Sequence, residues 1–171
     1  MSSYDQHRSA AETIVARCAV VTLSDTRTPA TDASGLRIRE LLQDEGHLVA
    51  EYEVIPDDPA RLDALLAALL ARDDIDAVVT NGGTGISRRD ATVPVIEKHI
   101  QQPLPGFGEL FRMLSWEQVG SGAMLSRAIG GVAGRKVLFS LPGSTNAVEL
   151  AMTKLILPEI RHLLQELYKP G

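Results

Sequence analysis

The sequence lacks the cysteines that a disulfide framework or a zinc site would need. Its 171 residues include a single cysteine, Cys18, so no disulfide can form within the chain. Cys18 lies in the apolar run Cys18–Leu23, where a small buried thiol is the expected role, and one cysteine gives no zinc pattern. The four histidines are scattered without ligand spacing, and we expect all of them at the surface.

Basic residues and long apolar runs are also scarce. Lys and Arg number 17 against 22 Asp and Glu, which gives a net charge of -5. Nucleic-acid binding usually needs a basic surface to displace phosphate counterions, so we expect no nucleic-acid partner. No apolar run approaches the ~20 residues of a membrane span, and residues Met1–Ala11 are too polar for a secretory signal. We therefore expect a cytoplasmic protein with no membrane partner.

The composition that remains is typical of one globular domain. Apolar residues make up 44% and charged residues 23% of the chain, both ordinary values. A chain of this length can bury a substantial core. Residues 1–12 are polar and predict a flexible tail, while no repeat or linker divides the rest. The sequence thus predicts a single domain over residues 1–171.

Buried strands alternate with helices along the chain. Strands are predicted at 14–23, 48–55, 76–81 and 136–141. Helices are predicted from Asp32 or Ser34 to about Glu45, over 62–70, at 95–99 and 109–114, and over 146–168, where Pro158 should interrupt the last one. This alternation indicates βαβ units, and hence an α/β fold: a three-layer αβα sandwich with a mostly parallel sheet.

Three polar turns follow three of the predicted strands. They consist of Ser24 and Asp25; Asn81, Gly82, Gly83, Thr84 and Gly85; and Pro142, Gly143 and Ser144. In a parallel sheet these turns should emerge at one edge, beyond which open α/β sheets bind ligands. The glycines would let the backbone approach phosphate oxygens and present N–H groups to them. Taken alone, however, such a glycine turn could equally be an ordinary tight turn.

Charged residues follow the glycine turn. Arg88 and Arg89 could neutralise phosphates, because the arginine fork suits that geometry, although a solvated loop would explain them if the glycines were absent. Asp90 would repel an anionic ligand unless a cation lay between them. Mg²⁺ held by one or two carboxylates together with substrate phosphates resolves this conflict. Asp90 is therefore a candidate Mg²⁺ ligand.

A second carboxylate could come from Asp57 or Asp58, at the end of the second strand. Asp58 could equally cap the next helix, with Pro59 at its first position. We therefore assign Asp57 to the chemistry and Asp58 to capping. The residues alone predict a phosphate-binding crevice with a carboxylate pair suited to Mg²⁺, and they do not identify the substrate. Arg127 could be either an anion contact or a surface charge, and the sequence does not decide between these roles.

Several short motifs occur in a set order along the chain. They are Thr80–Gly85, Arg88–Thr92 and Pro105–Glu109, with Asp32–Gly35, Leu125–Arg127 and Pro142–Ser144. Together they resemble the molybdopterin-binding family of MogA, MoaB and the plant and animal G domains. The likeness covers about residues 15–165, and the segment Phe111–Glu117 is more similar to the MoaB branch than to MogA.

The resemblance implies adenylylation of molybdopterin by Mg·ATP, with release of pyrophosphate. Some MoaB proteins lack the acidic residues of competent members, whereas this chain keeps both, as Asp57 and Asp90. The resemblance assigns these two to Mg²⁺ and the nucleotide, and the turn 82–85 with Ser24 and Asp25 to the nucleotide side. It assigns to the molybdopterin side Glu109, Ser126, Arg127, Pro142, Gly143 and Ser144. Asn81, which replaces the family's usual threonine or serine, and Arg89 are further binding candidates.

The resemblance also implies partners. Family members form trimers, and MoaB types often pair them into hexamers, so we expect a homotrimer or homohexamer. Phe107, Phe111 and Trp116 are expected to pack either in a core or in a subunit contact, which makes them candidate interface residues. Hand-over of the product to a molybdenum insertase is a further expectation. The rival hypothesis is a non-catalytic molybdopterin carrier or scaffold. A generic nucleotide hydrolase is a weaker one, because the sequence has no Walker-type phosphate loop.

Overall fold

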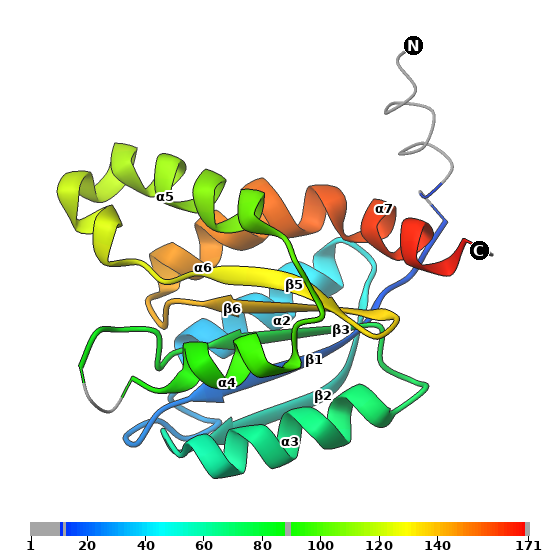
Figure 1. Ribbon diagram of the computed structural model, residues 1–171, viewed down its shortest axis with the longest axis horizontal. Helices are drawn as coiled ribbons and strands as arrows, with labels where there is room; N and C mark the ends of the chain where they lie inside the picture. The colour runs from blue at the N-terminus through cyan, green and yellow to red at the C-terminus, as the bar shows by residue number, and fades with distance from the viewer. Residues whose placement is uncertain (1–10, 12, 88–89, 170–171) are drawn as a thin grey trace.

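The computed structural model describes residues 11, 13–87 and 90–169, and it confirms the three-layer α/β sandwich (Figure 1). A six-stranded sheet has the order β2-β1-β3-β6-β5-β4. The strands are β1 (Arg17–Leu23), β2 (Leu48–Ile55), β3 (Ala77–Asn81), β4 (Gln102–Pro103), β5 (Ile129–Ala133) and β6 (Lys136–Leu141). β2, β1, β3 and β6 run parallel, while β5 is antiparallel to both β6 and β4.

Helices cover both faces of the sheet. They are α2 (Ala33–Asp44), α3 (Pro59–Ala71), α4 (Thr92–His99), α5 (Pro105–Val119), α6 (Thr145–Ala151) and α7 (Leu157–Tyr168), with the 3-10 helix η1 (Gly120–Leu125) and the π-helix η2 (Met152–Ile156). Successive side chains of β1 point to opposite faces. Val20 joins the core formed with α2, α5, α6 and α7, whereas Val21 joins the core formed with α3 and α4. The parallel strands are therefore buried on both faces, as their continuous apolar sequences predict.

The helix starts follow the predicted capping chemistry. Asp58 accepts hydrogen bonds from the backbone N–H groups of Ala60 and Arg61, at 2.9 and 3.3 Å, with Pro59 in the first turn of α3. The capping role assigned to Asp58 is therefore confirmed. Asp32, one of the two candidates for α2, accepts from Gly35 N at 3.0 Å.

The C-terminal helix is interrupted next to Pro158, as predicted. The interruption does not end the helix, because the chain passes from α6 through the π-helix η2 directly into α7. The Leu157 N–H reaches back five residues to Met152 O. This wider turn lies immediately before Pro158, where a proline ring would crowd the preceding turn of an α-helix. The α-helical hydrogen-bond pattern is interrupted, and the helix itself continues.

The expectation that all four histidines lie at the surface is wrong. His47 is 2% exposed, and its Nδ1 accepts a hydrogen bond from Ala16 N at 3.1 Å. Burial, with the nearby positive charge of Arg161, lowers the pKa of His47 to about 4, so it is neutral. Of the two roles expected for the aromatic residues, Phe107 and Phe111 have the core role, whereas Trp116 is 63% exposed and stays a candidate interface residue. Within the described residues, no helix is long and apolar enough to cross a membrane.

Candidate functional site

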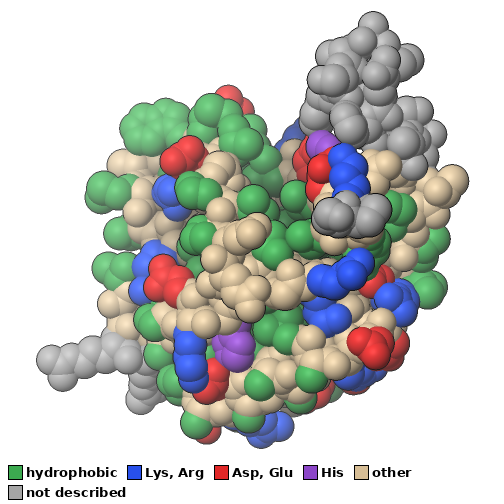
Figure 2. Space-filling view, turned by 45° about the vertical axis from the view of Figure 1, so that its right-hand side comes forward, with side chains coloured by type: hydrophobic (Ala, Val, Ile, Leu, Met, Phe, Trp, Pro, Cys, Tyr) green, Lys and Arg blue, Asp and Glu red, His purple; other side chains and the backbone are tan. Residues whose placement is uncertain are grey.

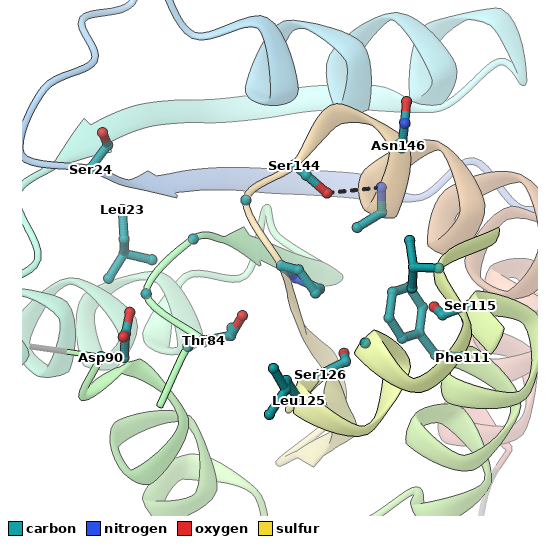
Figure 3. A pocket seen from close by; sticks show the side chains of 18 of the residues that line it. Leu23, Ser24, Thr84, Asp90, Phe111, Ser115, Leu125, Ser126, Ser144 and Asn146 are labelled. Atoms are coloured by element: carbon teal, nitrogen blue, oxygen red, sulfur yellow. Dashed lines mark hydrogen bonds between the residues drawn. The ribbon is translucent and has the colours of Figure 1, made fainter. Parts of the chain in front are cut away.

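A cleft of about 1140 Å³ opens beyond the carboxyl ends of β1, β3 and β6 (Figure 3). One wall is formed by the three polar turns that follow these strands, because neighbouring parallel strands end at the same edge. The other wall comes from α5, η1 and Ser126 directly after η1, with Phe111, Ser115 and Ser126 facing the turns. The cleft therefore lies where open α/β sheets bind their ligands.

Close approach of backbones explains the glycine at position 82. Gly82 has φ +96°, which L side chains rarely adopt, and a Cβ there would overlap the carbonyl oxygen of Leu23. Its N–H donates to Leu141 O at 3.0 Å. Gly143 lies against it, since a Cβ on Gly143 would be 3.2 Å from Gly82 Cα. Gly82 thus joins the three turns into one surface.

Gly83 leaves room for polar side chains to converge. It has φ +63°, and a Cβ there would overlap Thr92 Oγ1 and lie 2.9 Å from Asp57 Oδ1. A side chain at this position would therefore displace Thr92, at the start of α4, and Asp57, after β2. The missing Cβ allows groups from two other elements to reach the same turn.

Asp57 lies on the cleft with part of its carboxylate unsatisfied. Its Oδ1 is buried and has no hydrogen-bond partner among the described residues, while its N–H donates to Asp25 Oδ1 at 3.0 Å. Burial, assisted by the negative charges of Asp25 and Asp90, raises the pKa of the Asp57 carboxyl. An unpartnered buried carboxylate is costly unless a cation or donor compensates it.

Asp90 lines the same cleft, but its carboxylate has a hydrogen-bond partner. Its Oδ2 accepts a hydrogen bond from Ser87 N at 2.8 Å. Hydrogen bonding by Ser87 is the main cause that lowers the pKa of Asp90, with smaller contributions from Gly85 N–H and the charge of Arg127. Asp90 is therefore ionised at neutral pH.

Asp57 and Asp90 are suited to bind a cation whose remaining ligands come from a bound substrate. No group of three or more His, Cys, Asp or Glu side chains converges as a metal cage in the described parts of the chain. Asp57 and Asp90 nevertheless line one cleft, and Asp57 Oδ1 lacks a donor. Two carboxylates completed by phosphate oxygens and water match the way Mg²⁺ is usually bound beside phosphates.

Arg127 braces the loop that follows the glycine turn. Its Nε donates to Thr84 O at 3.0 Å, and its Nη2 donates to Asp90 O at 2.7 Å and to Gly85 O. The contacts described for its guanidinium are thus to backbone carbonyls rather than to the open cleft. This arrangement fixes the position of the loop carrying Asp90.

Most of the predicted site residues meet at this cleft. Its lining includes Ser24, Asp57, Gly82, Gly83, Thr84, Gly85, Asp90, Ser126, Pro142, Gly143 and Ser144. Asp25 is exposed beside it and holds the backbone of Asp57. Ser144 also caps α6 by accepting from Ala147 N at 3.2 Å.

Two of the predicted residues are placed elsewhere. Asn81 is fully buried beneath the turn, where Oδ1 accepts from Ser34 Oγ and Nδ2 donates to Thr22 Oγ1, both at 2.8 Å. Glu109 lines a separate groove beside β4 and β5, outside the cleft. Arg89 falls outside the described residues. The interpretation of Asn81 as a direct ligand contact thus has no geometric support, because its polar atoms face the interior.

Sequence reasoning missed several polar lining residues, namely Arg27, Ser115, Gln118 and Asn146. Arg27 follows the first turn by two positions, so its proximity to Ser24-Asp25 was a usable signal. Ser115 and Gln118 were missed because the helix was expected to end near residue 114, whereas α5 continues to Val119.

Replacing Asp57 by asparagine should raise the melting temperature by a few degrees in metal-free buffer at pH 7. A carboxyl whose pKa is raised by folding stabilises the fold below its unfolded pKa, and that contribution is lost as pH rises through the folded pKa. At pH 7 the folded protein therefore bears the free-energy cost of ionising Asp57 in an unfavourable place. Asp57→Asn removes this cost, so the stability advantage of the variant over the wild type should shrink toward pH 4. Asp74→Asn is the control, because Arg72 lowers the pKa of Asp74 to about 2. A less stable Asp57→Asn protein at pH 7 would contradict the prediction.

Comparison with known proteins identifies the family. The family described as "Probable molybdopterin binding domain" matches residues 19–162. "Molybdenum cofactor biosynthesis protein B" of Bacillus anthracis is 51% identical over 168 residues, covering 98% of this chain and 99% of that protein.

Solved structures agree with this sequence match. A crystal structure of a molybdenum cofactor biosynthesis protein B has TM-score 0.89 and 51% identity, covering 92% of this chain and 98% of that one. The tungsten cofactor synthesizing protein MoaB from Pyrococcus furiosus has TM-score 0.79 and 38% identity, covering 91% and 98%. The glycine turn, the carboxylates beside it and the cleft all lie within the matched residues 19–162. The chain therefore belongs to the molybdopterin-binding family that includes MoaB and MogA.

Proposed function

We propose that this chain acts in molybdenum-cofactor biosynthesis and transfers an adenylyl group from Mg·ATP to molybdopterin. The family match and the names of the relatives support molybdopterin as ligand. The observation that carries the catalytic part is Asp57, whose unpartnered Oδ1 lies with Asp90 along the glycine turn. A carrier of molybdopterin would need the glycine turn but not two carboxylates that repel its phosphate.

In the proposed reaction, a phosphate oxygen of molybdopterin bonds to the α-phosphorus of ATP. The bond from that phosphorus to the oxygen bridging the β-phosphate breaks, and pyrophosphate leaves with its electron pair. The protein has little covalent work in such a transfer, so alignment and charge stabilisation should supply most of the acceleration. Mg²⁺, when bound, would neutralise phosphate charge next to Asp57 and Asp90.

The cleft is suited to hold two substrates. Its volume of about 1140 Å³ exceeds that of most single-ligand pockets, which are typically ~300–1,000 Å³. Backbone at Gly83 and Thr84 would bind phosphate oxygens, since the Gly82 N–H already donates to Leu141 O, and Arg127 would keep the loop carrying Asp90 in place. Ser115 and Ser126 on the opposite wall would contact the second substrate.

The proposal includes a homo-oligomer, a trimer or hexamer, and hand-over of the product to a molybdenum insertase. Large apolar side chains are exposed on α5 and η1; they are Leu110, Met113, Trp116, Val119, Met124 and Leu125. Hydrophobic side chains gather on the left-hand side of Figure 2, where Figure 1 places these two elements. Exposed apolar side chains gathered in this way are typical of protein interfaces.

Purified protein incubated with molybdopterin and Mg·[α-³²P]ATP should transfer labelled AMP to the pterin and release pyrophosphate. Omission of Mg²⁺ should stop the transfer, and a reaction without molybdopterin gives the background of ATP hydrolysis. Molybdopterin binding without a labelled product would favour the carrier hypothesis. Pyrophosphate release that does not depend on molybdopterin would instead favour a nucleotide hydrolase.

A further inference from the structure

A buried polar cluster lies directly beneath the cleft, with Asp32 at its centre. The Asp32 side chain has no exposed surface. Its Oδ2 accepts from Thr22 Oγ1 at 2.6 Å and from Tyr52 Oη at 2.8 Å, and its Oδ1 accepts from Ser34 Oγ at 3.1 Å. Burial raises the pKa of Asp32, but these hydrogen bonds and that from Gly35 outweigh it and lower the pKa overall. The cluster thus contains a buried negative charge.

Arg27 is the cation that faces this charge. Its Nη1 lies 3.5 Å from Asp32 Oδ1 and donates to Ser34 Oγ at 2.6 Å. Its Nη2 donates to Gly143 O at 3.1 Å, which ties the loop after β1 to the turn after β6. The guanidinium is therefore held in one orientation by groups at the start of α2 and by the turn after β6.

The rest of the Arg27 side chain reaches the cleft. It is 34% exposed and lines the wall formed by the polar turns. A guanidinium has five N–H donors, and two of them are used in the contacts with Ser34 and Gly143. Among the described lining residues Arg27 is the single cation, beside the acidic Asp57, Asp90 and Glu149. An anion entering the cleft has this one described side chain to neutralise it.

We propose that Arg27 binds a phosphoryl group in the cleft and that Asp32 is the residue that positions it. A long side chain loses rotamer freedom when it grips a ligand, and the buried contacts with Asp32 and Ser34 remove that loss in advance. The planar fork offers paired donors to phosphate oxygens. The phosphoryl group belongs to ATP or to molybdopterin if the proposed function holds, whereas the anion contact itself does not depend on that function.

Arg27→Ala should weaken binding of inorganic pyrophosphate by about 10- to 30-fold, the loss expected for one charge-assisted contact. Calorimetric titrations with Mg·ATP, adenosine and molybdopterin then locate the phosphoryl group. Selective loss of ATP affinity, with adenosine unchanged, places Arg27 on the nucleotide, while selective loss of molybdopterin affinity places it on the pterin. Arg27→Lys, which keeps the charge, should recover part of the affinity. Arg72→Ala is the control, because its ion pairs with Glu51 and Asp74 lie outside the cleft.

A double-mutant cycle tests the positioning role. Asp32→Asn should weaken pyrophosphate binding in the wild-type background and should have no further effect in the Arg27→Ala background, because its influence passes through Arg27. If Asp32→Asn does not fold, Tyr52→Phe removes one hydrogen bond to Asp32 and should give a smaller loss with the same dependence on Arg27. Equal losses in both backgrounds would overturn the positioning role.

Two results would contradict the proposed contact between Arg27 and a phosphoryl group. Unchanged pyrophosphate affinity in Arg27→Ala would make Arg27 only a brace between two turns, and equal loss of adenosine and ATP binding would indicate a distorted cleft. Either result overturns the proposal. Absence of AMP transfer by the wild-type protein would instead refute the proposed function, and it would leave the pyrophosphate measurements unaffected.

Discussion

Replacing Asp57 and Asp90 together by alanine should abolish AMP transfer to molybdopterin while the protein stays folded. Both carboxylates line the cleft beside the glycine turn, and neither side chain belongs to the hydrophobic core. Their removal leaves no described buried donor on the Asp57 side, because Asp57 Oδ1 has no partner. Loss of groups that act only on the developing charge should lower kcat by ~10²-fold or more.

The single variant Asp90→Asn separates charge from loop structure. Asp90 accepts the Ser87 N–H, so alanine at this position would also loosen the loop, whereas asparagine can keep an acceptor there. Asp90→Asn should therefore retain molybdopterin binding and lose most of the turnover. Asp74→Ala, which removes an exposed carboxylate paired with Arg72, is the matched control. Turnover by the double variant close to that of the wild type would remove both carboxylates from the mechanism.

The stability and activity predictions for Asp57 concern one property of the carboxylate. Its raised pKa shows that the fold holds the group where ionisation is unfavourable in the absence of a compensating cation. A variant that is more stable but less active is the expected result when a residue is retained for chemistry rather than for folding. Added Mg²⁺ and ATP should therefore narrow the stability difference between wild type and Asp57→Asn.

The layers of the fold could be predicted from the sequence because the apolar strand pattern and the helix-capping residues indicate the same elements. The continuous apolar strands predicted a sheet covered on both faces, and β1 indeed supplies alternate residues to two cores. The turns after β1, β3 and β6 meet at one edge because these strands are parallel neighbours. Asp58 with Pro59 is a local capping signal that needs no knowledge of tertiary structure.

The features that were assigned wrongly or missed depend on contacts between distant parts of the chain. Asn81 was expected at the ligand because it begins the glycine turn, yet it hydrogen-bonds Thr22, 59 residues away, inside the protein. Strand β5 was missed because glycines weaken strand propensity. Its Gly130 and Gly131 are required by Phe139 and Ile100, which cover their backbone. No local sequence pattern predicts such packing.

Gly82→Ala should be the most destabilising single methyl addition at the site, lowering the free energy of unfolding by ~3 kcal/mol or more. Two costs combine at this position. The positive φ disfavours an L side chain by ~1–2 kcal/mol, and the overlap with Leu23 O forces backbone to move, which typically costs ~1–3 kcal/mol. For a chain of this length the melting temperature should fall by roughly 6–12 °C.

Gly134→Ala separates the two costs in the same protein. Gly134 has φ +64°, but a Cβ there would meet nothing within 4 Å, so only the backbone cost of ~1–2 kcal/mol applies. Gly106→Ala, in the first turn of α5 with open space and no positive φ, should be neutral or slightly stabilising. Denaturant unfolding of the three variants gives the differences directly. Equal losses for Gly82→Ala and Gly134→Ala would mean that the turn yields to a methyl group, and that contact between the turns after β1 and β3 does not require glycine.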